Sequence, residues 1–299
     1  MNSKTTKPRT FHHEALAWRT AVQNNGGTVR PATLRAVSNF CTAISAAGIR
    51  SKFLRLNLVC GNNLAAARVP LYRGASATGT QYGSAIDTNL GPFTANDYSE
   101  ATGLQGDGSS KALDTTIAIG TLKTFGMSTN SYHLSVYNRS LSSFSRISFG
   151  ANNLYDDNVA YKSVFGINTG STSQYEGSYV PEYAAGGGND SYSYVYVYNP
   201  PADLRGFNLG DYSSGYGSGA VYTLNGTELT SSESNYGESH TDFNASDPTA
   251  LLFLGDDEYY SDQLLSAYSC GLPMTTTANR LAFATAMTAF QKALRRNFP

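Results

Sequence analysis

Charged residues, cysteine and long apolar runs are all scarce in this sequence. Only 14% of its 299 residues are charged, and Cys41, Cys60 and Cys270 are its three cysteines. No apolar run reaches the roughly 18 residues of a transmembrane helix, and the stretch MNSKTTKPRTFHHEA lacks the apolar core of a secretory signal. We therefore expect no membrane partner and no disulfide framework. We expect reduced, partly buried thiols in a protein that is made in a cytoplasm.

Motifs that carry catalysis or bind metals are also missing. The HHE triplet at residues 12–14 lacks the H-E-x-x-H spacing of a zinc-binding helix, and no G-x-S-x-G elbow of a serine hydrolase occurs. The acidic stretch at 256–262 fits neither a calcium loop nor the paired carboxylates of a glycosidase, and is typical of a solvated loop. The sequence therefore predicts no catalytic residue, no metal site, no cofactor and no enzyme activity. A glycan hydrolase that uses Asp256 or Asp257 is the least favoured alternative.

Aromatic and small residues are abundant, with 21 Tyr, 14 Phe and 29 Gly. Asn225-Gly226 lies between two strand-like runs and predicts a type I′ hairpin turn, because both central residues of that turn need a positive φ. Residues 131–139 alternate apolar and polar side chains, which predicts a half-buried strand. Further strands are expected at 112–119, 144–149, 160–167, 191–198, 249–255 and 261–271. This pattern favours a mainly β sandwich or jelly roll.

Helical spacing is found toward the two ends of the chain. Residues 11–23 and 31–47 predict a helical hairpin, and shorter helical pieces are expected at 51–58 and 64–67. A closing helix is predicted at 276–298, with an apolar face made of Leu281, Phe283, Ala284, Met287, Phe290 and Leu294. We therefore divide the chain into a basic N-terminal arm and helical anchoring region, 1–73, and a β-sandwich with its closing helix, 74–299. Deletion of residues 1–68 should leave a folded sandwich.

Charge is distributed unevenly along the chain. Residues 1–73 contain eleven Lys or Arg and one acid, whereas 74–299 contain ten Lys or Arg and 21 acids. Either the basic region packs against the acidic part of its own chain, or it docks on an acidic neighbour in an assembly. In the second case the anchoring contacts are expected from Trp18, Arg30, Arg35, Arg50, Lys52 and Arg55. Nucleic acid is a less favoured partner, because no known nucleic-acid-binding motif accompanies the basic residues.

A row of tyrosines marks the predicted strand at 191–198, SYSYVYVY. Side chains alternate across a strand, so Tyr192, Tyr194, Tyr196 and Tyr198 are predicted to share one face. Such a row is either an exposed platform that binds sugars or a protein, because tyrosine offers a rigid amphipathic surface, or it is packing within a half-buried sheet. These four residues are the candidate site for a ligand or partner.

Several stretches resemble segments of known proteins. GAVYTLNGTEL, TALLFLG and SDQLLSAYSCG, followed by a helix, are similar to the end of lectin-like jelly rolls of the concanavalin A and laminin G type. VPLYRG and TGLQGDGSSKALDT resemble segments of phage virion proteins that carry this fold behind a small helical region. The resemblance covers residues 12–299. It implies a lectin-like two-sheet jelly-roll sandwich with an N-terminal helical hairpin and a C-terminal helix.

The resemblance and the absence of catalytic motifs lead us to expect a structural component of a tailed-phage virion. It would be a head decoration or cement protein, or a tail-associated protein, assembled in the host cytoplasm. Its partners would be capsid or tail subunits and further copies of itself. The alternative is a carbohydrate-binding protein of the tail that recognises a host surface glycan through the tyrosine row.

Overall fold

Two helices near the N-terminus confirm the sequence prediction. In this computed structural model, α1 is His13–Asn24 and α2 is Pro31–Ala46. The His12 side chain accepts a hydrogen bond from the Glu14 backbone N–H and so caps α1, whereas Pro31 occupies the first position of α2. The structure describes residues 10–91, 93–128, 131–141, 147–152, 163–168, 178–185, 192–197, 201, 203–212, 220–229, 231–236, 249–252 and 260–296.

The described strands form two antiparallel sheets, called sheet A and sheet B below. Sheet A has the order β13 (Thr227–Leu229), β12 (Ala220–Leu224), β11 (Gly206–Tyr212), β6 (Tyr132–Asn138), β16 (Leu264–Gly271), β4 (Gly103–Gln105) and β3 (Tyr98–Ser99), and β1 (Phe53–Asn57) also pairs with β16. Sheet B has the order β14 (Ser231–Tyr236), β10 (Tyr192–Val197), β9 (Ser178–Ala185), β8 (Ser163–Asn168), β7 (Ile147–Asn152), β15 (Thr249–Leu252), β5 (Leu113–Ala118) and β2 (Thr88–Asn89). The other elements are η1 (Arg50–Lys52), α3 (Leu64–Ala67), η2 (Ala95–Asp97), α4 (Ile119–Thr124) and α5 (Thr277–Ala293).

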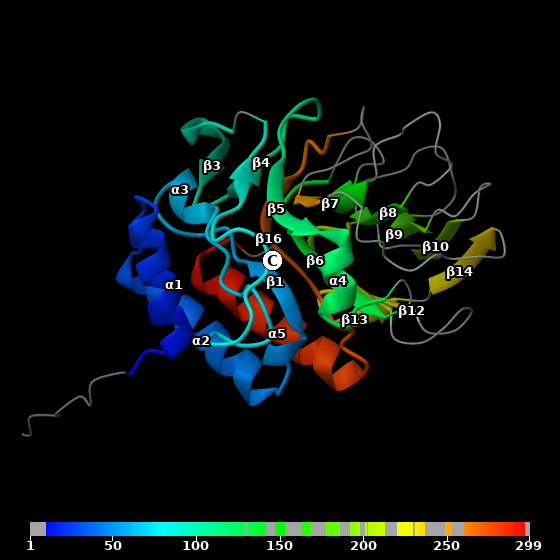
Figure 1. Ribbon diagram of the computed structural model, residues 1–299, viewed down its shortest axis with the longest axis horizontal. Helices are drawn as coiled ribbons and strands as arrows, with labels where there is room; N and C mark the ends of the chain where they lie inside the picture. The colour runs from blue at the N-terminus through cyan, green and yellow to red at the C-terminus, as the bar shows by residue number, and fades with distance from the viewer. Residues whose placement is uncertain are drawn as a thin grey trace, which may run out of the picture.

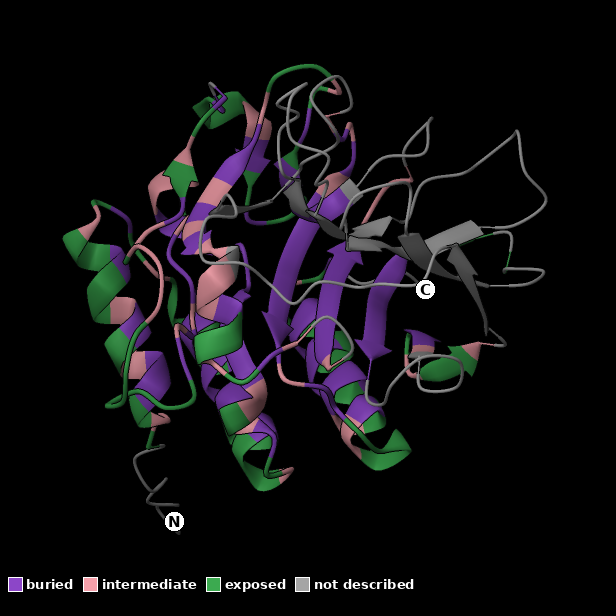
Figure 2. Cartoon of the chain, turned by 45° about the vertical axis from the view of Figure 1, so that its right-hand side comes forward, coloured by how far each residue is buried: buried purple, intermediate pink, exposed green. Residues whose placement is uncertain are grey.

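Sheet A is the middle of three layers (Figure 1). One buried cluster fills the space between the sheets, where the rings of Phe149 on β7 and Tyr268 on β16 are 4.7 Å apart. A second cluster lies between sheet A and the helices, where Phe283 of α5 packs against Phe207 of β11. Figure 2 shows the buried strands of sheet A beside helices whose outward sides are exposed. The protein is therefore a mixed α/β structure of two antiparallel sheets, N-terminal helices and a C-terminal helix.

The central strand β6 differs from the half-buried strand that the sequence predicts. All seven of its residues are buried. Leu134 belongs to the cluster between the sheets, whereas His133 packs edge-on against Phe53 and Phe283 on the helical side. The prediction was wrong because the helices cover the second face of sheet A, and the polar residues of β6 lie beneath them.

A second correction concerns residues 51–58, which were expected to be helical. The chain makes the short 3-10 turn η1 and then forms β1, antiparallel to β16. Every second residue from Leu54 to Leu58 is a leucine with a polar residue between, and this period of two is the pattern of a strand. Sheet A thus contains one strand from residues 1–73 together with strands from residues 74–299. The two predicted regions therefore share one sheet.

The predicted hairpin is confirmed by β12 and β13. Leu224 and Thr227 are opposite each other, and the turn residues Asn225 and Gly226 have φ values of 52° and 89°. Both values are positive, as the sequence pattern requires. The strands predicted at 112–119, 144–149, 160–167, 249–255 and 261–271 correspond to β5, β7, β8, β15 and β16, with shifted ends. All three cysteines are free thiols, and each of them is buried.

The C-terminal helix is shorter than predicted. Helix α5 ends at Ala293, and Arg295 adopts a positive φ of 60°. Arg296 therefore lies beyond the helix, where its buried guanidinium donates to backbone carbonyls of Leu58, Val59, Glu100 and Ser266. Most of the predicted apolar face is buried, but Leu281 is 50% exposed. Among the described residues, no helix combines the length and apolarity that crossing a membrane requires.

Candidate functional site

The predicted tyrosine strand is β10, which lies between β9 and β14 in sheet B. It contains the first three of the four tyrosines, and Tyr198 lies outside the described residues. Cross-strand register adds two more tyrosines: Tyr236 of β14 is opposite Tyr192, and Tyr179 of β9 is opposite Tyr196. Residues directly opposite each other in an antiparallel pair lie on the same face of the sheet. The sequence does not show this gathering, because the three strands are separated by loops.

The register of sheet B also shows which of its faces is turned toward sheet A. Phe149 of β7 faces sheet A, where it contacts Tyr268. Ala151 is two residues further along β7 and lies on the same face. Ala151 is opposite Phe165 of β8, and Phe165 is opposite Tyr183 of β9. Phe165 and Tyr183 therefore lie on the face toward sheet A as well.

This face assignment extends to the tyrosine strand. Tyr183 is opposite Ser193 of β10, so Ser193 lies on the face toward sheet A. Successive residues of a strand alternate between faces, which places Tyr194 on the face turned away from sheet A. We call the residues that share this placement the outer tyrosine face: Tyr179, Tyr192, Tyr194, Tyr196 and Tyr236.

Two of the six predicted anchoring residues are buried inside the protein. Trp18 is 4% exposed, and its indole N–H donates to the carbonyl oxygen of Val69 over 3.0 Å. Arg55 is fully buried, pairs with Asp87 and donates to the carbonyl oxygen of Ser84. Neither side chain offers surface to another chain.

Two further anchoring candidates make ion pairs within the chain. Arg30 is 68% exposed and pairs with the buried carboxylate of Glu100. Arg50 donates to Glu14 over 2.7 Å, and its guanidinium lies 3.7 Å from the centre of the Tyr72 ring. The Arg30–Glu100 pair joins the basic region to the acidic part of the same chain. Internal packing thus accounts for part of the charge asymmetry.

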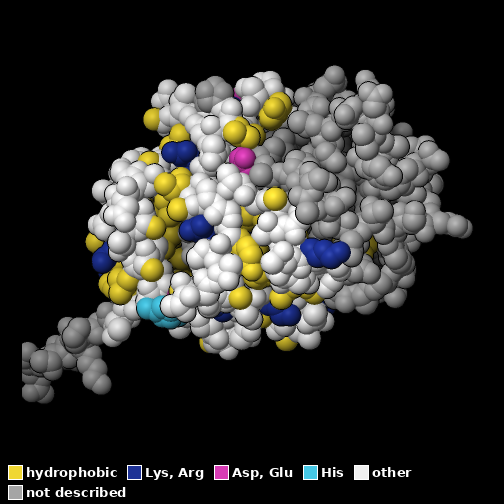
Figure 3. Space-filling view, viewed as in Figure 1, with side chains coloured by type: hydrophobic (Ala, Val, Ile, Leu, Met, Phe, Trp, Pro, Cys, Tyr) yellow, Lys and Arg dark blue, Asp and Glu magenta, His cyan; other side chains and the backbone are white. Residues whose placement is uncertain are grey.

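The last two anchoring candidates lie nearer the surface. Arg35 is exposed on α2, and Lys52 is partly exposed at the end of η1. On the face shown in Figure 3, the basic side chains of the described residues lie apart from one another and do not merge into one basic surface. This spacing gives no continuous track for a nucleic-acid backbone on that face.

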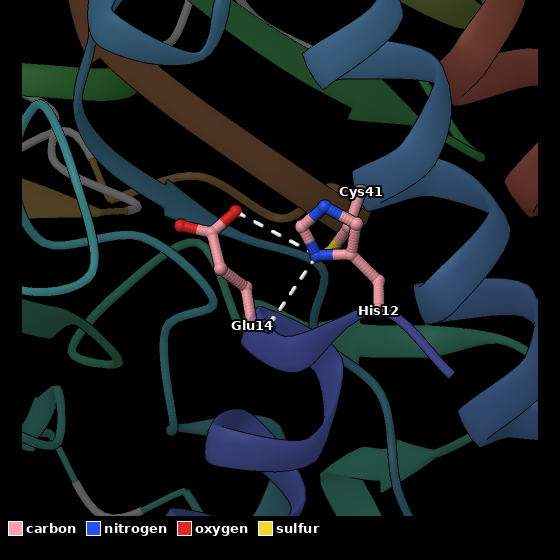
Figure 4. Close-up of side chains that lie close together, drawn as sticks. All are labelled: His12, Glu14 and Cys41. Carbon is pink, nitrogen blue, oxygen red and sulfur yellow. Dashed lines mark hydrogen bonds and ion pairs between the residues drawn. The ribbon is translucent and has the colours of Figure 1, made fainter. Parts of the chain in front are cut away.

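A polar cluster lies where the start of α1 meets α2. His12 and Glu14 come from the start of α1, and Cys41 comes from α2 (Figure 4). One ring nitrogen, one carboxylate oxygen and the Sγ atom lie within 4.8 Å of one another. Within the part of the chain that the structure describes, no other three His, Cys, Asp or Glu residues gather in this way. Sequence reasoning missed the cluster because Cys41 is remote from the HHE triplet along the chain.

The electrostatics of this cluster do not favour covalent catalysis. Burial raises the pKa of the Cys41 thiol to about 12, so the reactive thiolate is scarce at neutral pH. Burial, followed by the neighbouring His13 ring at 4.6 Å, lowers the pKa of His12, which favours the neutral imidazole. A neutral imidazole, a carboxylate and a sulfur atom are the donors that zinc binds in proteins. The raised pKa of the thiol disfavours nucleophilic attack, whereas the three donor types match those of zinc sites, where the metal itself has to displace the thiol proton.

A histidine and two serines form a second polar group inside sheet A. His133 Nε2 lies 3.0 Å from Ser269 Oγ, which lies 2.6 Å from Ser135 Oγ. His133 Nδ1 lies 2.7 Å from the carbonyl oxygen of Leu272. The three polar side chains are fully buried beneath the helices, so no substrate reaches them. Their hydrogen bonds satisfy polar atoms in the core.

The candidate carboxylates of a glycosidase fall largely outside the described residues. Asp256 and Asp257 lie outside the residues that the structure describes. Asp262 is described, and its carbonyl oxygen accepts a hydrogen bond from Gln105 over 2.6 Å. The structure therefore defines no pair of catalytic carboxylates at this loop among the residues that it describes.

Comparison with known proteins yields only distant structural similarity. No family model and no curated protein sequence matches the chain. Domain 4 of AbnA, an extracellular GH43 arabinanase from Geobacillus stearothermophilus solved with arabinotriose, aligns over 67% of this chain and 88% of its own, with 12% identity and a TM-score of 0.34. A Trypanosoma rangeli sialidase solved with 2,3-difluorosialic acid aligns over 84% of this chain but 38% of its own, with 9% identity and a TM-score of 0.35. The chain is thus only distantly similar to these two structures, and scores of this size assign it neither a family nor a function.

Proposed function

We propose that this protein binds carbohydrate without catalysis, through the outer tyrosine face of a lectin-like two-sheet jelly roll. The observation that carries the proposal is the register across β14, β10 and β9, which gathers five tyrosines on the face turned away from sheet A. Tyrosine suits such a surface, because its ring is apolar and rigid while its hydroxyl forms hydrogen bonds. The other face of sheet B, which is turned toward sheet A, packs in the core between the two sheets.

We further propose that the glycan lies on a host cell and that the protein belongs to the tail of a phage virion. The sequence resemblance of VPLYRG and TGLQGDGSSKALDT to segments of phage virion proteins supports this setting. Several copies in one particle would add the avidity that a weak sugar site needs. A homo-oligomer assembled in the host cytoplasm is therefore part of the proposal.

Glycan-array binding and titration of the protein with its best glycan test the proposal. Replacing Tyr194 and Tyr196 together by Ala should weaken binding at least about tenfold, since stacking on each ring contributes on the order of 1 kcal/mol. The matched pair Tyr194→Phe/Tyr196→Phe keeps both rings and should bind more tightly than the alanine pair. Tyr183→Phe, on the face toward sheet A, should bind as the original protein does. Equal binding by the alanine pair, with an unchanged melting temperature, would overturn the proposal.

A structural role in the virion is the second candidate, favoured by basic residues on the surface of the N-terminal layer. Arg35 is exposed on α2, and Arg30 keeps 68% of its side chain exposed despite its ion pair. In this case the protein would decorate or cement the head, with Arg35 facing an acidic neighbour. Immunogold labelling of intact particles separates the two settings: label over the head supports the structural role, and label on the tail supports host recognition. Particles that carry no label would contradict both settings.

A further inference from the structure

The His12–Glu14–Cys41 cluster brings together donors that the sequence keeps apart. Glu14 Oε2 lies 4.0 Å from His12 Nδ1, and all three donor atoms lie within 4.8 Å of one another. Figure 4 shows the His12 and Glu14 side chains meeting in front of Cys41. Glu14 is 6% exposed and Cys41 is fully buried, so water is largely excluded from two of the donors.

The surroundings of the cluster also fit a cation. Arg50 Nε binds Glu14 Oε1 over 2.7 Å, which orients the carboxylate so that Oε2 lies toward His12. Such a hydrogen bond to the outer oxygen is the usual support of a metal-binding carboxylate. The buried hydroxyl of Tyr72 is a hydrogen-bonding neighbour of the Cys41 thiol and has no other partner among the described residues. Its oxygen, or a water molecule, is available for a fourth position.

We propose that His12, Glu14 and Cys41 bind one zinc ion, which fastens the start of α1 to α2. Zinc prefers four ligands and accepts nitrogen, oxygen and sulfur at about 2.0–2.3 Å, so tetrahedral ligands lie about 3.3–3.8 Å apart. The three donors need to move together by about 1 Å from their observed separations. The chain can supply this movement through side-chain torsions of Glu14 and Cys41.

Charge and proton balance follow from the donor set. Cys41 releases its proton to solvent on binding, Glu14 is already a carboxylate and His12 binds as the neutral ring. Two negative ligands then neutralise the charge of Zn²⁺, and Arg50 keeps its hydrogen bond to Oε1. The bond that zinc replaces is the weak cap from the Glu14 N–H to His12 Nδ1, which is 3.3 Å long.

Cobalt(II) is the probe for this site, because a thiolate ligand gives Co²⁺ an intense near-ultraviolet charge-transfer band. The full-length protein, freed of metal with a chelator, should bind one equivalent of Co²⁺ with this band, and Zn²⁺ should displace it. Cys41→Ser should abolish the band, whereas Cys60→Ser, which removes another buried thiol, should keep it. Glu14→Gln should weaken binding at least about tenfold, as loss of metal-site groups does.

Stability gives an independent readout. Zinc at 100 times its dissociation constant should stabilise the folded protein by about 2.7 kcal/mol and so raise its melting temperature. The Cys41→Ser and Glu14→Gln proteins should lose that increase. Absence of the charge-transfer band in the original protein, or its persistence in Cys41→Ser, would overturn the proposal.

Discussion

The guanidinium of Arg55 and the carboxylate of Asp87 form an ion pair that is fully withdrawn from solvent. Two neutral groups complete the carboxylate's hydrogen bonds: the Tyr268 hydroxyl and the Asn57 amide each donate to Asp87 Oδ2 over 2.7 Å. Burial alone would lower the pKa of Arg55, but the charge of Asp87 raises it. Arg55 lies on β1, which belongs to the predicted anchoring region. Through Asp87 and Tyr268 the ion pair connects β1 to β16 in the buried core.

Loss of the Asp87 carboxylate should destabilise the protein severely. Asp87→Ala leaves the Arg55 charge buried without a partner, which typically costs about 3–5 kcal/mol of unfolding free energy. Urea denaturation followed by tryptophan fluorescence measures this loss through the midpoint. The control is Asp203→Ala, because the Asp203–Arg205 pair is about half exposed and should contribute little. A loss below about 1 kcal/mol in Asp87→Ala would mean that the pair is dispensable.

Stability should fall in mild acid because of His133. Burial lowers the pKa of His133 to about 4, against the ordinary value of 6.5. The unfolded chain therefore binds a proton below pH 6.5 that the folded protein takes up only near pH 4. The contribution of neutral His133 to the free energy of unfolding is fully present above pH 6.5. It is lost as the pH falls toward 4 and amounts to on the order of 3 kcal/mol in total.

The measurement for His133 is the urea midpoint at a series of pH values from 7.5 to 4, compared with His133→Asn. The asparagine amide can still donate to the Leu272 carbonyl, but it does not titrate. The variant should be less stable than the original protein at pH 7.5, and the difference should shrink toward pH 4. A difference between the two proteins that stays constant across the pH series would show that His133 does not cause the loss of stability in acid.

The hairpin turn should not tolerate alanine at Gly226. Its φ of 89° disfavours any side chain, and a Cβ there would lie 3.1 Å from Leu281 Cδ1 and 3.3 Å from Ala284 Cβ. Gly48 is the matched control, because its φ is 69° but no atom lies within 4 Å of the added Cβ. We expect Gly48→Ala to cost about 1 kcal/mol and Gly226→Ala about 2–3 kcal/mol, measured by thermal unfolding. Equal costs would mean that α5 moves aside without penalty.

Removal of residues 1–68 should abolish cooperative folding. The sequence favours a sandwich that survives this deletion, but the structure leads to the opposite expectation. The deletion takes away α1, α2 and β1, and it uncovers the side of sheet A where Phe207 and Phe283 are buried. The truncated protein should bind a hydrophobic dye and lose its near-ultraviolet circular dichroism. A cooperative thermal transition like that of the intact chain would contradict this prediction.

A point substitution in the helical layer is a milder test of whether the sheets depend on the helices for stability. Phe40 on α2 is 2% exposed and packs against Phe290 of α5, with ring centres 6.0 Å apart. Phe40→Ala should cost about 3–5 kcal/mol of unfolding free energy, as truncation of a buried aromatic usually does. If tryptophan fluorescence and circular dichroism show one coincident transition that shifts by this amount, the helical layer and the sheets unfold together, whereas separate transitions would contradict that.

Local signals in the sequence are enough to predict part of this fold. Pro31 begins a helix at the predicted position, and Asn225-Gly226 makes the predicted turn, because each depends on the φ preferences of its own residues. The leucines from Leu54 to Leu58 also carry a strand pattern, because their period of two is the signal of β1.

What covers each face was decided only by tertiary structure. The period of two in β6 shows which residues share a face, but not that helices cover the side of His133. Likewise, the spacing within β10 does not place Tyr236 opposite Tyr192, and nothing in the HHE triplet points to Cys41. Sequence by itself determined the local elements through backbone preference and periodicity. Register and layer packing join residues far apart in the chain, so the outer tyrosine face and the metal-ligand cluster exist only in the folded protein.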